Sequence, residues 1–331
     1  MFKKILAAVV TLALALPLSA QAAPIIIKFS HVVANDTPKG QAANYFKKLA
    51  EERTKGRVKV EVYPNSQLFK DKEEMEALQM GSVQMLAPSL AKFAPLGLKE
   101  FEVFDLPFIF DDYSELHKVT QGPVGAKLLK KLETKGLIGL AYWDNGFKVM
   151  SANKPLKNVT DMRGLKMRIQ SSKVLDSQMR SVGAIPQVLA FSEVYQALQT
   201  GVVDGTENPP SNLYTQKMHE VQKYVTMSNH GYLGYAVLVN KKFWMGLPAD
   251  IRAALESSMK DATVFANSVA KKDNDEAMAG VKKSGKSQII TLTPAERAAW
   301  KKAMDKTHKE NMGRIGADIV KEVYAATGYK P

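Results

Sequence analysis

In the stretch Arg163-Gly-Leu-Lys-Met-Arg-Ile-Gln170, apolar residues alternate with Lys166, Arg168 and Gln170. This period of two predicts a β-strand with one polar row that ends at a loop. Arg168 lies near the end of that row, where its planar guanidinium can grip a carboxylate with two parallel N–H bonds. An arginine that only pairs with a surface carboxylate would give the same pattern, so the rest of the chain must decide between a ligand and a salt bridge.

A helix-to-strand unit follows this stretch and has a counterpart earlier in the chain. Both Ala77-Leu-Gln-Met-Gly-Ser-Val83 and Ala197-Leu-Gln-Thr-Gly-Val-Val203 have the pattern Ala-Leu-Gln-x-Gly-x-Val. Ser89 and Asn208 come at nearly the same distance after the two glycines. Because ligands of open α/β sheets lie beyond the carboxyl ends of strands, two such units predict a cleft with Ser89 on one wall and Asn208 on the other. The alternatives are a chance match and an Asn208 that only shapes a turn before Pro209.

The length of 331 residues exceeds the usual size of one domain and predicts two. We expect an α/β protein in which residues 24–148 form lobe I, with about 233–270 returning to it. Residues 149–232 are expected to form lobe II, with about 271–331 packing on it. The segment Pro248–Gly285 is predicted to be one nearly continuous helix that braces both lobes.

Shorter elements are predicted from hydrophobic periodicity and helix caps. The expected strands are 24–30, 58–63, 82–87 and 137–142, with a mostly extended segment at 225–239, and the expected helices are 40–54, 70–80 and one beginning at Pro294. Thr293 is expected to cap that last helix. The segment Trp143-Asp-Asn-Gly-Phe-Lys148 is expected to form a turn between two strands.

The first residues have the pattern of an export signal. A basic start precedes the apolar run Ile5–Leu18, and Ser19-Ala-Gln-Ala-Ala23 supplies small residues for cleavage near Ala22 or Ala23. The apolar run is too short for a stable membrane span. The chain has no cysteine, which excludes disulfides, thiolate chemistry and a cysteine-linked lipid anchor. We therefore predict a signal peptide at residues 1–23 and a freely diffusing periplasmic protein, expected to be a monomer.

The formal net charge of +13 is compatible with nucleic-acid binding, but the lysines are scattered through predicted helices without a basic stripe or an RNA-binding motif. We therefore expect no nucleic-acid partner. The excess charge is still useful, because a positive field draws an anionic ligand towards the protein.

Enzyme motifs are not found in the sequence. There is no dinucleotide-binding, phosphate-loop, zinc-peptidase or nucleophile-elbow motif, and the 5 histidines are dispersed. An acid pair among Asp161, Asp204 and Glu207 is the remaining catalytic alternative, although capping and turn roles explain these residues equally well. We expect no catalytic residue, no metal and no cofactor.

Several polar side chains follow predicted strand ends and are candidates for ligand binding. Lys39, Lys92 and Lys148 would each, taken alone, be interpreted as solvated surface lysines, but their common position lets several cations converge on one ligand. Further candidates lie at the same loops and turns or beside Arg168: His31, Ser89, Trp143, Gln170, Phe191, Asn208 and His230. A core position is the simpler interpretation of the tryptophans.

Five blocks of this sequence resemble the solute-binding subunit of tripartite ATP-independent periplasmic (TRAP) transporters. They are Gly164-Leu-Lys-Met-Arg168, Gly183-Ala-Ile-Pro186, Phe191-Ser-Glu-Val-Tyr195, Ala197-Leu-Gln-Thr-Gly201 and Val203-Asp-Gly-Thr-Glu-Asn-Pro209. Their order and spacing are more specific than any single block, and the similarity extends over the whole mature chain. The resemblance implies a two-lobed α/β binding protein that closes over its ligand and passes it to the small and large membrane subunits of a permease.

The resemblance also implies roles for individual residues. Arg168 is expected to pair with a ligand carboxylate, Asn208 to orient that arginine, and Phe191 to pack on the ligand. Ser89 and Lys148 differ from the glutamate and second arginine of members that bind sialic acid.

These differences favour the branch that binds C4-dicarboxylates such as succinate, fumarate or malate, with Lys39, Lys92 or Lys148 meeting the second carboxylate. The alternatives are another organic anion, such as a keto acid, an aromatic acid or a uronate, and an exported enzyme that acts on an anionic substrate.

Overall fold

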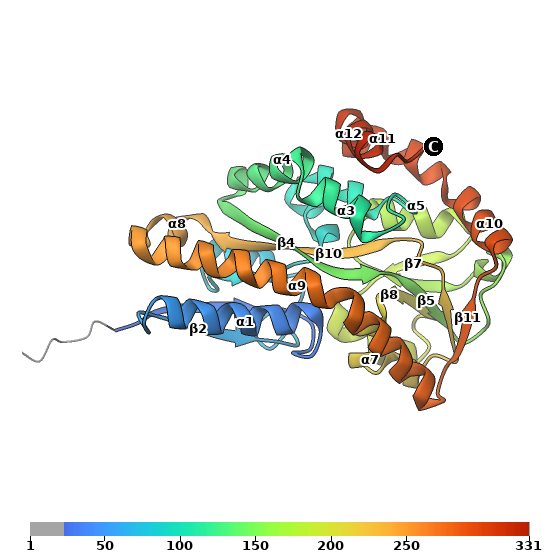
Figure 1. Ribbon diagram of the computed structural model, residues 1–331. Helices are drawn as coiled ribbons and strands as arrows, with labels where there is room; N and C mark the ends of the chain where they lie inside the picture. Colours follow the sequence, from blue (N-terminus) through green and yellow to red (C-terminus); the bar gives the residue numbers. More distant parts are fainter. Residues whose placement is uncertain (1–22, 331) are drawn as a thin grey trace, which may run out of the picture.

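The computed structural model describes residues 23–330, whose strands form two separate sheets (Figure 1). The first sheet has the order β2 (Val58–Tyr63), β1 (Ile25–Ser30), β3 (Met85–Leu86), β10 (Tyr232–Asn240) and β4 (Leu137–Phe147). Within it β1 is parallel to β2 and β3, whereas β10 is antiparallel to β3 and β4. The first half of the chain and one later strand therefore share this sheet.

The second sheet is built mainly from the middle of the chain. Its order is β11 (Gln288–Thr291), β9 (Tyr224–Met227), β5 (Val149–Ala152), β8 (Gly205–Asn208), β6 (Lys166–Ile169) and β7 (Ile185–Val188). The strand predicted around Arg168 is β6, with β8 and β7 parallel to it on its two sides. This pairing brings the ends of β6 and β8, and so Arg168 and Asn208, to the same edge of the sheet.

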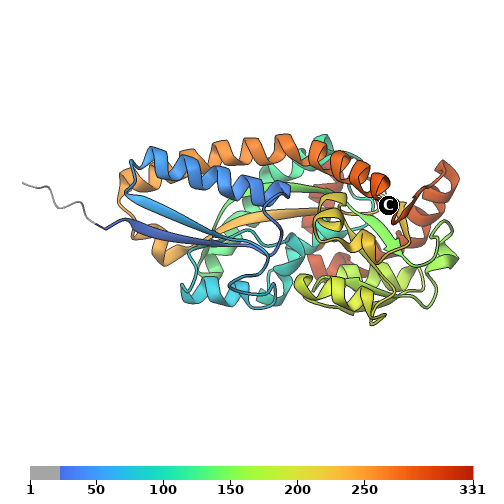
Figure 2. The same cartoon turned by 90° about the horizontal axis from the view of Figure 1, so that it is seen from below.

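Three segments carry the chain from one sheet to the other. Two are short, from β4 to β5 and from β9 to β10, and the third is the helix α9 (Ala249–Ser284). This helix has 36 residues, which corresponds to a length of about 54 Å. It runs beside α1 (Pro38–Arg53) over one face of the first sheet and continues to the second (Figures 1 and 2). The expected two-lobed α/β fold with a long bracing helix is thus confirmed.

The other helices are mostly short. The α-helices are α2 (Glu74–Met80), α3 (Tyr113–Thr120), α4 (Pro123–Lys131), α5 (Lys173–Ser181), α6 (Val194–Gln199), α7 (Pro210–Thr215), α8 (Lys241–Met245), α10 (Pro294–Met304), α11 (Lys306–Ile315) and α12 (Ala317–Thr327). The 3-10 helices are η1 (Leu90–Lys92), η2 (Ala94–Leu96), η3 (Lys99–Asp105), η4 (Leu132–Lys135), η5 (Val159–Met162), η6 (Phe191–Glu193) and η7 (Met218–Glu220). Thr293 caps α10 in a reciprocal capping box with Glu296, as its sequence predicts.

The turn predicted at 143–148 is wrong, because β4 continues as a strand through Phe147. Tyr232–Tyr235 of β10 pair with this part of β4, with an irregularity between Leu233 and Gly234. The long-range ladder therefore outweighs the local turn signal of the Asn-Gly pair, and the bulge absorbs the extra residue. The predicted strand at 82–87 is also shorter than expected, since only Met85 and Leu86 pair.

The last helix packs differently from the expectation for residues 271–331. Helix α12 contacts α3 and α4, which belong to the part of the chain assigned to lobe I, and its Val320 and Val323 share a core with Leu116 of α3. Apolar residues on one face of α12 explain this position, because they extend that core. The lobe boundaries themselves remain a prediction.

The predicted signal peptide lies outside the described residues, apart from Ala23. Within residues 23–330, no helix combines the length and the apolar character needed to cross a membrane.

Trp143 belongs to the hydrophobic core of the first lobe. Its ring is fully buried and lies 5.9 Å from that of Phe29 between their centroids. Its indole N–H donates to the Thr263 hydroxyl of α9 at 3.0 Å. These contacts give Trp143 a structural role, which joins the sheet to the long helix, and its candidate role in ligand binding stays a prediction.

We predict that Trp143→Phe destabilises the protein by about 2 kcal/mol, because it removes buried ring volume and a buried hydrogen bond. Urea unfolding followed by circular dichroism measures this loss, and Thr263→Ser, which keeps the hydroxyl, serves as the milder control. Unchanged stability combined with weaker ligand binding would return Trp143 to the binding site.

Candidate functional site

A small cavity lies between the two sheets, at the edge where β6 and β8 end. About 20 Å³ of it is open to the centre of a water molecule, which is room for one or two waters. It is lined by Val32, Val33, Lys39, Asp71, Ser89, Lys92, Arg168, Gln170, Phe191, Asn208, Asn212, Leu233 and Tyr235. Seven of the predicted ligand-binding residues are therefore brought together here, from both lobes.

Arg168 is held in the cavity wall by its own lobe. Its side chain is buried, and its Nε and Nη2 donate to the carbonyl oxygen of Leu189 at 3.1 and 2.9 Å. The Phe191 ring lies 5.8 Å from the guanidinium carbon. Burial lowers the pKa of Arg168, but an arginine stays charged in proteins. The carbonyl and the ring thus fix the direction of a permanent cation.

Lys39 supplies a second buried cation from the start of α1. Its Nζ donates to the carbonyl oxygen of Ala87 at 2.9 Å and lies 3.8 Å from the ring centroid of Tyr235. Burial lowers the pKa of Lys39 to about 7, although the nearby Glu74 opposes this effect. Lys39 is therefore close to losing its proton at neutral pH, and any added negative charge would restore it.

Lys92, the third cation, is paired with two carboxylates. Its Nζ lies 2.9 Å from Asp71 Oδ2 and 3.3 Å from Glu74 Oε1. Burial raises the pKa of Glu74, whereas the burial effect on Asp71 is outweighed by Lys92 and Arg168, so that the pKa of Asp71 is lowered. Asp71 is therefore a stable anion in this group.

Asp71 was missed in the sequence, and it connects the lobes. Its Oδ1 accepts from the backbone N–H of Phe191 at 3.1 Å, and its Oδ2 lies 3.9 Å from Arg168 Nη2. It belongs to the charged run Lys70-Asp-Lys-Glu-Glu74, which resembles an exposed helix start, and no local signal marks it as buried. The same holds for Glu74. Asn212 and Tyr235 were also missed, because Asn212 follows Asn208 without a motif of its own and Tyr235 lies inside a segment that the sequence marks only as extended.

The remaining cavity residues have local partners. Asn208 Nδ2 donates to Thr206 Oγ1 at 3.3 Å, and Ser89 Oγ accepts from the backbone N–H of Ala91 at 3.4 Å. The guanidinium of Arg168 bonds to Leu189 and not to Asn208, so the orienting role that the resemblance implies for Asn208 stays a prediction. Gln170 lies on the same wall beyond the end of β6.

Lys148 and His230 do not line the cavity. Lys148 Nζ lies 2.7 Å from Glu207 Oε1, and His230 Nε2 lies 2.9 Å from Glu207 Oε2, with all three side chains buried. Burial would raise the pKa of Glu207, but Lys148 and His230 outweigh it and lower this pKa to about 2. The charge of Lys148 is thus neutralised by Glu207 inside the protein, and Lys148 does not face the cavity.

His31 is also placed outside the cavity lining, although its neighbours Val32 and Val33 belong to it. Both of its ring nitrogens are buried without a side-chain hydrogen-bond partner. Burial, with a smaller effect of Lys39, lowers the pKa of His31 to about 3. His31 is therefore a neutral ring in this structure.

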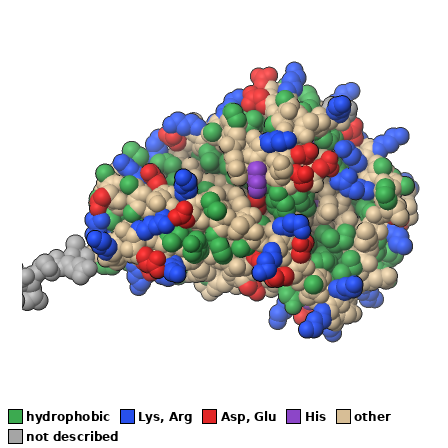
Figure 3. Space-filling view, viewed as in Figure 1, with side chains coloured by type: hydrophobic (Ala, Val, Ile, Leu, Met, Phe, Trp, Pro, Cys, Tyr) green, Lys and Arg blue, Asp and Glu red, His purple; other side chains and the backbone are tan. Residues whose placement is uncertain are grey.

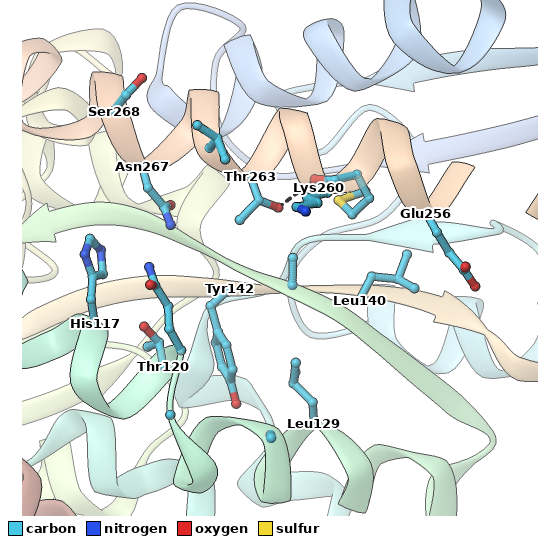
Figure 4. Close-up of a pocket in the computed structure, with 16 residues that line it drawn as sticks. His117, Thr120, Leu129, Leu140, Tyr142, Glu256, Lys260, Thr263, Asn267 and Ser268 are labelled. Atoms are coloured by element: carbon cyan, nitrogen blue, oxygen red, sulfur yellow. Dashed lines mark hydrogen bonds between the residues drawn. The ribbon is translucent and has the colours of Figure 1, made fainter. Parts of the chain in front are cut away.

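A larger groove lies on the first lobe, away from the buried cations. It has about 740 Å³ and runs between α3, α4 and α9 with β4 at its floor (Figure 4). His117, whose Nε2 lies 2.6 Å from Asp144 Oδ2, is at one end of it. Its lining is mostly apolar and lacks the convergence of several cations, so the smaller cavity is the better candidate for an anion.

The outer surface has no continuous basic stripe on the face drawn in Figure 3, where basic and acidic side chains alternate. In the cavity, by contrast, Lys39, Lys92 and Arg168 converge on one small space. Two sheets that face each other across a small pocket of buried cations define a two-lobed solute-binding protein.

The comparisons with known proteins agree with this class. Residues 29–314 match the family model described as bacterial extracellular solute-binding protein, family 7, and the chain belongs to this family. The C4-dicarboxylate-binding periplasmic protein DctP of Rhodobacter capsulatus is 63% identical over 98% of both chains. The resemblance to TRAP solute-binding proteins is thus confirmed.

Solved structures give the same result. A TRAP periplasmic solute-binding protein from Shewanella oneidensis, with bound succinate, has a TM-score of 0.90 and 44% identity, and the match covers 92% of this chain and 100% of that one. One from Pseudomonas aeruginosa, with bound L-malate, has a TM-score of 0.85 and 46% identity, with 87% and 100% coverage.

We predict that Glu207→Gln destabilises the protein by about 3 to 5 kcal/mol at pH 7, because it leaves the Lys148 charge buried without its partner. The lowered pKa of Glu207 means that its contribution is complete above its ordinary value of 4.5 and is lost as the pH falls towards 2. The variant should therefore lose less stability than the wild type between pH 5 and pH 3.

Denaturant unfolding at several pH values measures both effects. Asp176→Asn, which breaks the exposed pair with Arg180, is the matched control and should change stability by less than about 0.5 kcal/mol. Equal stabilities of Glu207→Gln and this control would mean that the buried pair contributes nothing.

Proposed function

We propose that this protein is a periplasmic receptor that binds a C4-dicarboxylate, such as succinate, fumarate or malate, between its lobes. It then delivers the ligand to a TRAP permease with a small and a large membrane subunit. In this proposal it is exported by its N-terminal signal, acts as a monomer and has no catalytic step. The observation that carries the proposal is the group of three buried cations, Lys39, Lys92 and Arg168, around one cavity.

The charge of this group suits a dianion. Three cations stand against two carboxylates, Asp71 and Glu74, which leaves one net positive charge when all are ionised. Burial raises the pKa of Glu74, and uptake of a proton by its carboxyl would increase the net charge to two. A ligand with two carboxylates would neutralise the group, whereas a neutral solute would leave its charge unbalanced in a buried site that holds little water.

The arrangement also suggests how the two ends of the ligand are held. Arg168 lies on the second sheet, and Lys39 and Lys92 belong to elements on the first. One carboxylate would bind the guanidinium and the other would meet the lysines, so that a diacid links the lobes. Relatives of this chain with bound succinate and L-malate support this ligand class.

Binding requires the lobes to move apart. The cations are at most 7% exposed, and the cavity has room for only one or two waters. A diacid therefore needs a more open form for access, and closure would then exclude water and strengthen each ionic contact.

We predict that the wild type binds succinate and that Arg168→Lys weakens binding about 100-fold, because an ammonium cannot replace the two-pronged guanidinium. Isothermal calorimetry measures the affinity, with Arg180→Lys on the exposed side of α5 as the control that leaves it unchanged. Failure of succinate, malate and fumarate to bind, alongside clear binding of a monoacid or a sugar acid, would reject the proposed ligand class.

A second prediction concerns protons. Because the pKa of Lys39 is about 7 before binding and a dianion would raise it, binding should take up protons near pH 7.5. Affinity should be greatest below pH 7 and fall as the pH rises through the raised pKa. Phosphate and Tris buffers have different ionisation enthalpies. The difference between the binding heats in the two buffers therefore gives the number of protons taken up when succinate binds.

The control for this experiment is Lys48→Met, on the exposed side of the same helix, which should keep the uptake. Lys39→Met should abolish it. Equal heats in both buffers for the wild type would show that Lys39 is already fully charged or stays neutral.

A further inference from the structure

The three segments that connect the sheets meet at one hydrogen-bonded group beside the cavity. Asn145 lies near the end of β4, just before the chain crosses to β5. Tyr235 lies in β10, just after the chain returns. Asn274 belongs to α9, the third connection, and Asn212 belongs to α7 of the second lobe. Elements that must change their relative positions when the lobes move are thus joined by a few side chains.

Asn145 is at the centre of this group and is fully buried. Its Nδ2 donates to Tyr235 Oη at 2.7 Å and to Asn212 Oδ1 at 3.0 Å. Its Oδ1 accepts from the Ser211 hydroxyl at 2.7 Å, and its backbone oxygen accepts from Asn274 Nδ2 at 2.7 Å. Both donors and the side-chain acceptor of Asn145 are therefore used, each towards a different residue.

Asn274 also makes close contacts on both sides of this group. A Cβ at Gly146 would lie 2.7 Å from Asn274 Nδ2, so a side chain at this position would displace the Asn274 amide. Asn274 Oδ1 also accepts from the backbone N–H of Ser211 at 2.9 Å. Helix α9 thereby holds the start of α7 against the strand that carries Asn145.

Two members of the group face the ligand cavity. Asn212 and Tyr235 both line it, and the Tyr235 ring lies under Lys39 at 3.8 Å. Because the Tyr235 oxygen accepts a hydrogen bond from Asn145, the hydroxyl hydrogen of Tyr235 remains available to donate to a group in the cavity. Burial raises the pKa of Tyr235 to about 12, so this proton is retained at physiological pH.

We propose that Asn145 is a positioning residue for ligand capture. It fixes Tyr235 and Asn212 in the cavity wall and links β4, β10, α7 and α9 in the closed form, although it does not touch the ligand itself. Movement of α7 away from β4 would break its bonds to Asn212 and Ser211, so ligand binding and the Asn145 contacts stabilise the same state. This inference rests on the proposed binding of a dicarboxylate in the cavity.

The test is a double-mutant cycle with Asn145→Ala and Tyr235→Phe, in which succinate affinity is measured by calorimetry. We expect Asn145→Ala to weaken binding about tenfold and Tyr235→Phe to weaken it several-fold. The double variant should bind about as well as Asn145→Ala alone, because Asn145 acts in part through Tyr235. Additive effects, or an affinity of Asn145→Ala equal to the wild type, would overturn the proposal.

Asn267→Ala is the matched control. Asn267 lies on α9, like Asn274, and its Oδ1 accepts from the backbone N–H of Asp144 at 2.9 Å. It therefore links β4 to α9 as Asn145 does, but it faces the outer groove and not the cavity (Figure 4). The Asn267→Ala variant should have a lower melting temperature than the wild type, as Asn145→Ala should. Its affinity for succinate should be unchanged. Equal losses of affinity in both variants would mean that any contact between β4 and α9 has the same effect, which contradicts a specific role.

Tyr235→Phe keeps the aromatic ring at this position, so it tests the proposal even if Asn145→Ala does not fold. Unchanged succinate binding by Tyr235→Phe would contradict the proposed role of Asn145. Asn145→Ser is the milder replacement at that position and should retain part of the affinity. Absence of succinate binding by the wild type would count against the proposed ligand. Normal wild-type binding with undiminished Asn145→Ala binding would count against the positioning role alone.

Discussion

The burial of three cations between two sheets is the constraint on which the rest of the site depends. Removing an ion from water costs several kcal/mol, and this cost must be offset by nearby oxygens or opposite charges. Arg168 has the Leu189 carbonyl, Lys39 has the Ala87 carbonyl, and Lys92 has Asp71 and Glu74. These partners do not cancel the positive charge completely, and what remains favours an anion. In the proposed site the same arrangement would make neutral solutes poor ligands, so its selectivity for charge would follow from its burial.

The fold supplies the second requirement, which is that the site can open. Its walls belong to two sheets, and the chain passes between these sheets through two short connections and through α9. Asp71 contacts both Lys92 in the first lobe and the Phe191 N–H in the second, so the cavity is also the place where the lobes hold each other. A ligand that bridges the same two walls stabilises the closed form, because it adds contacts that only this form can make. The chain's membership of a family of extracellular solute-binding proteins agrees with a receptor of this kind.

The sequence predicts those parts of the structure that depend on local pattern. Alternation located β6 and placed Arg168 in its polar row, and the long helical segment predicted α9 to within a residue of Ala249–Ser284. It does not predict contacts made by residues distant in the chain. Lys148 and Glu207 are 59 residues apart, and only the pairing of β5 with β8 brings them together. Asp71 resembled a surface charge because its partners, Lys92, Arg168 and the Phe191 N–H, come from other segments. For Trp143 the pairing of β4 with β10, a segment distant in the chain, decided that a strand and not a turn would form.

The most direct test of this account is a high-resolution crystal structure of the protein with succinate. The account predicts one molecule between the lobes, with one carboxylate on the Arg168 guanidinium and the other within hydrogen-bonding distance of Lys39 or Lys92. It also predicts that Lys148 stays paired with Glu207. Succinate bound in the groove between α4 and α9, or a carboxylate bound to Lys148 with Arg168 free of the ligand, would contradict it.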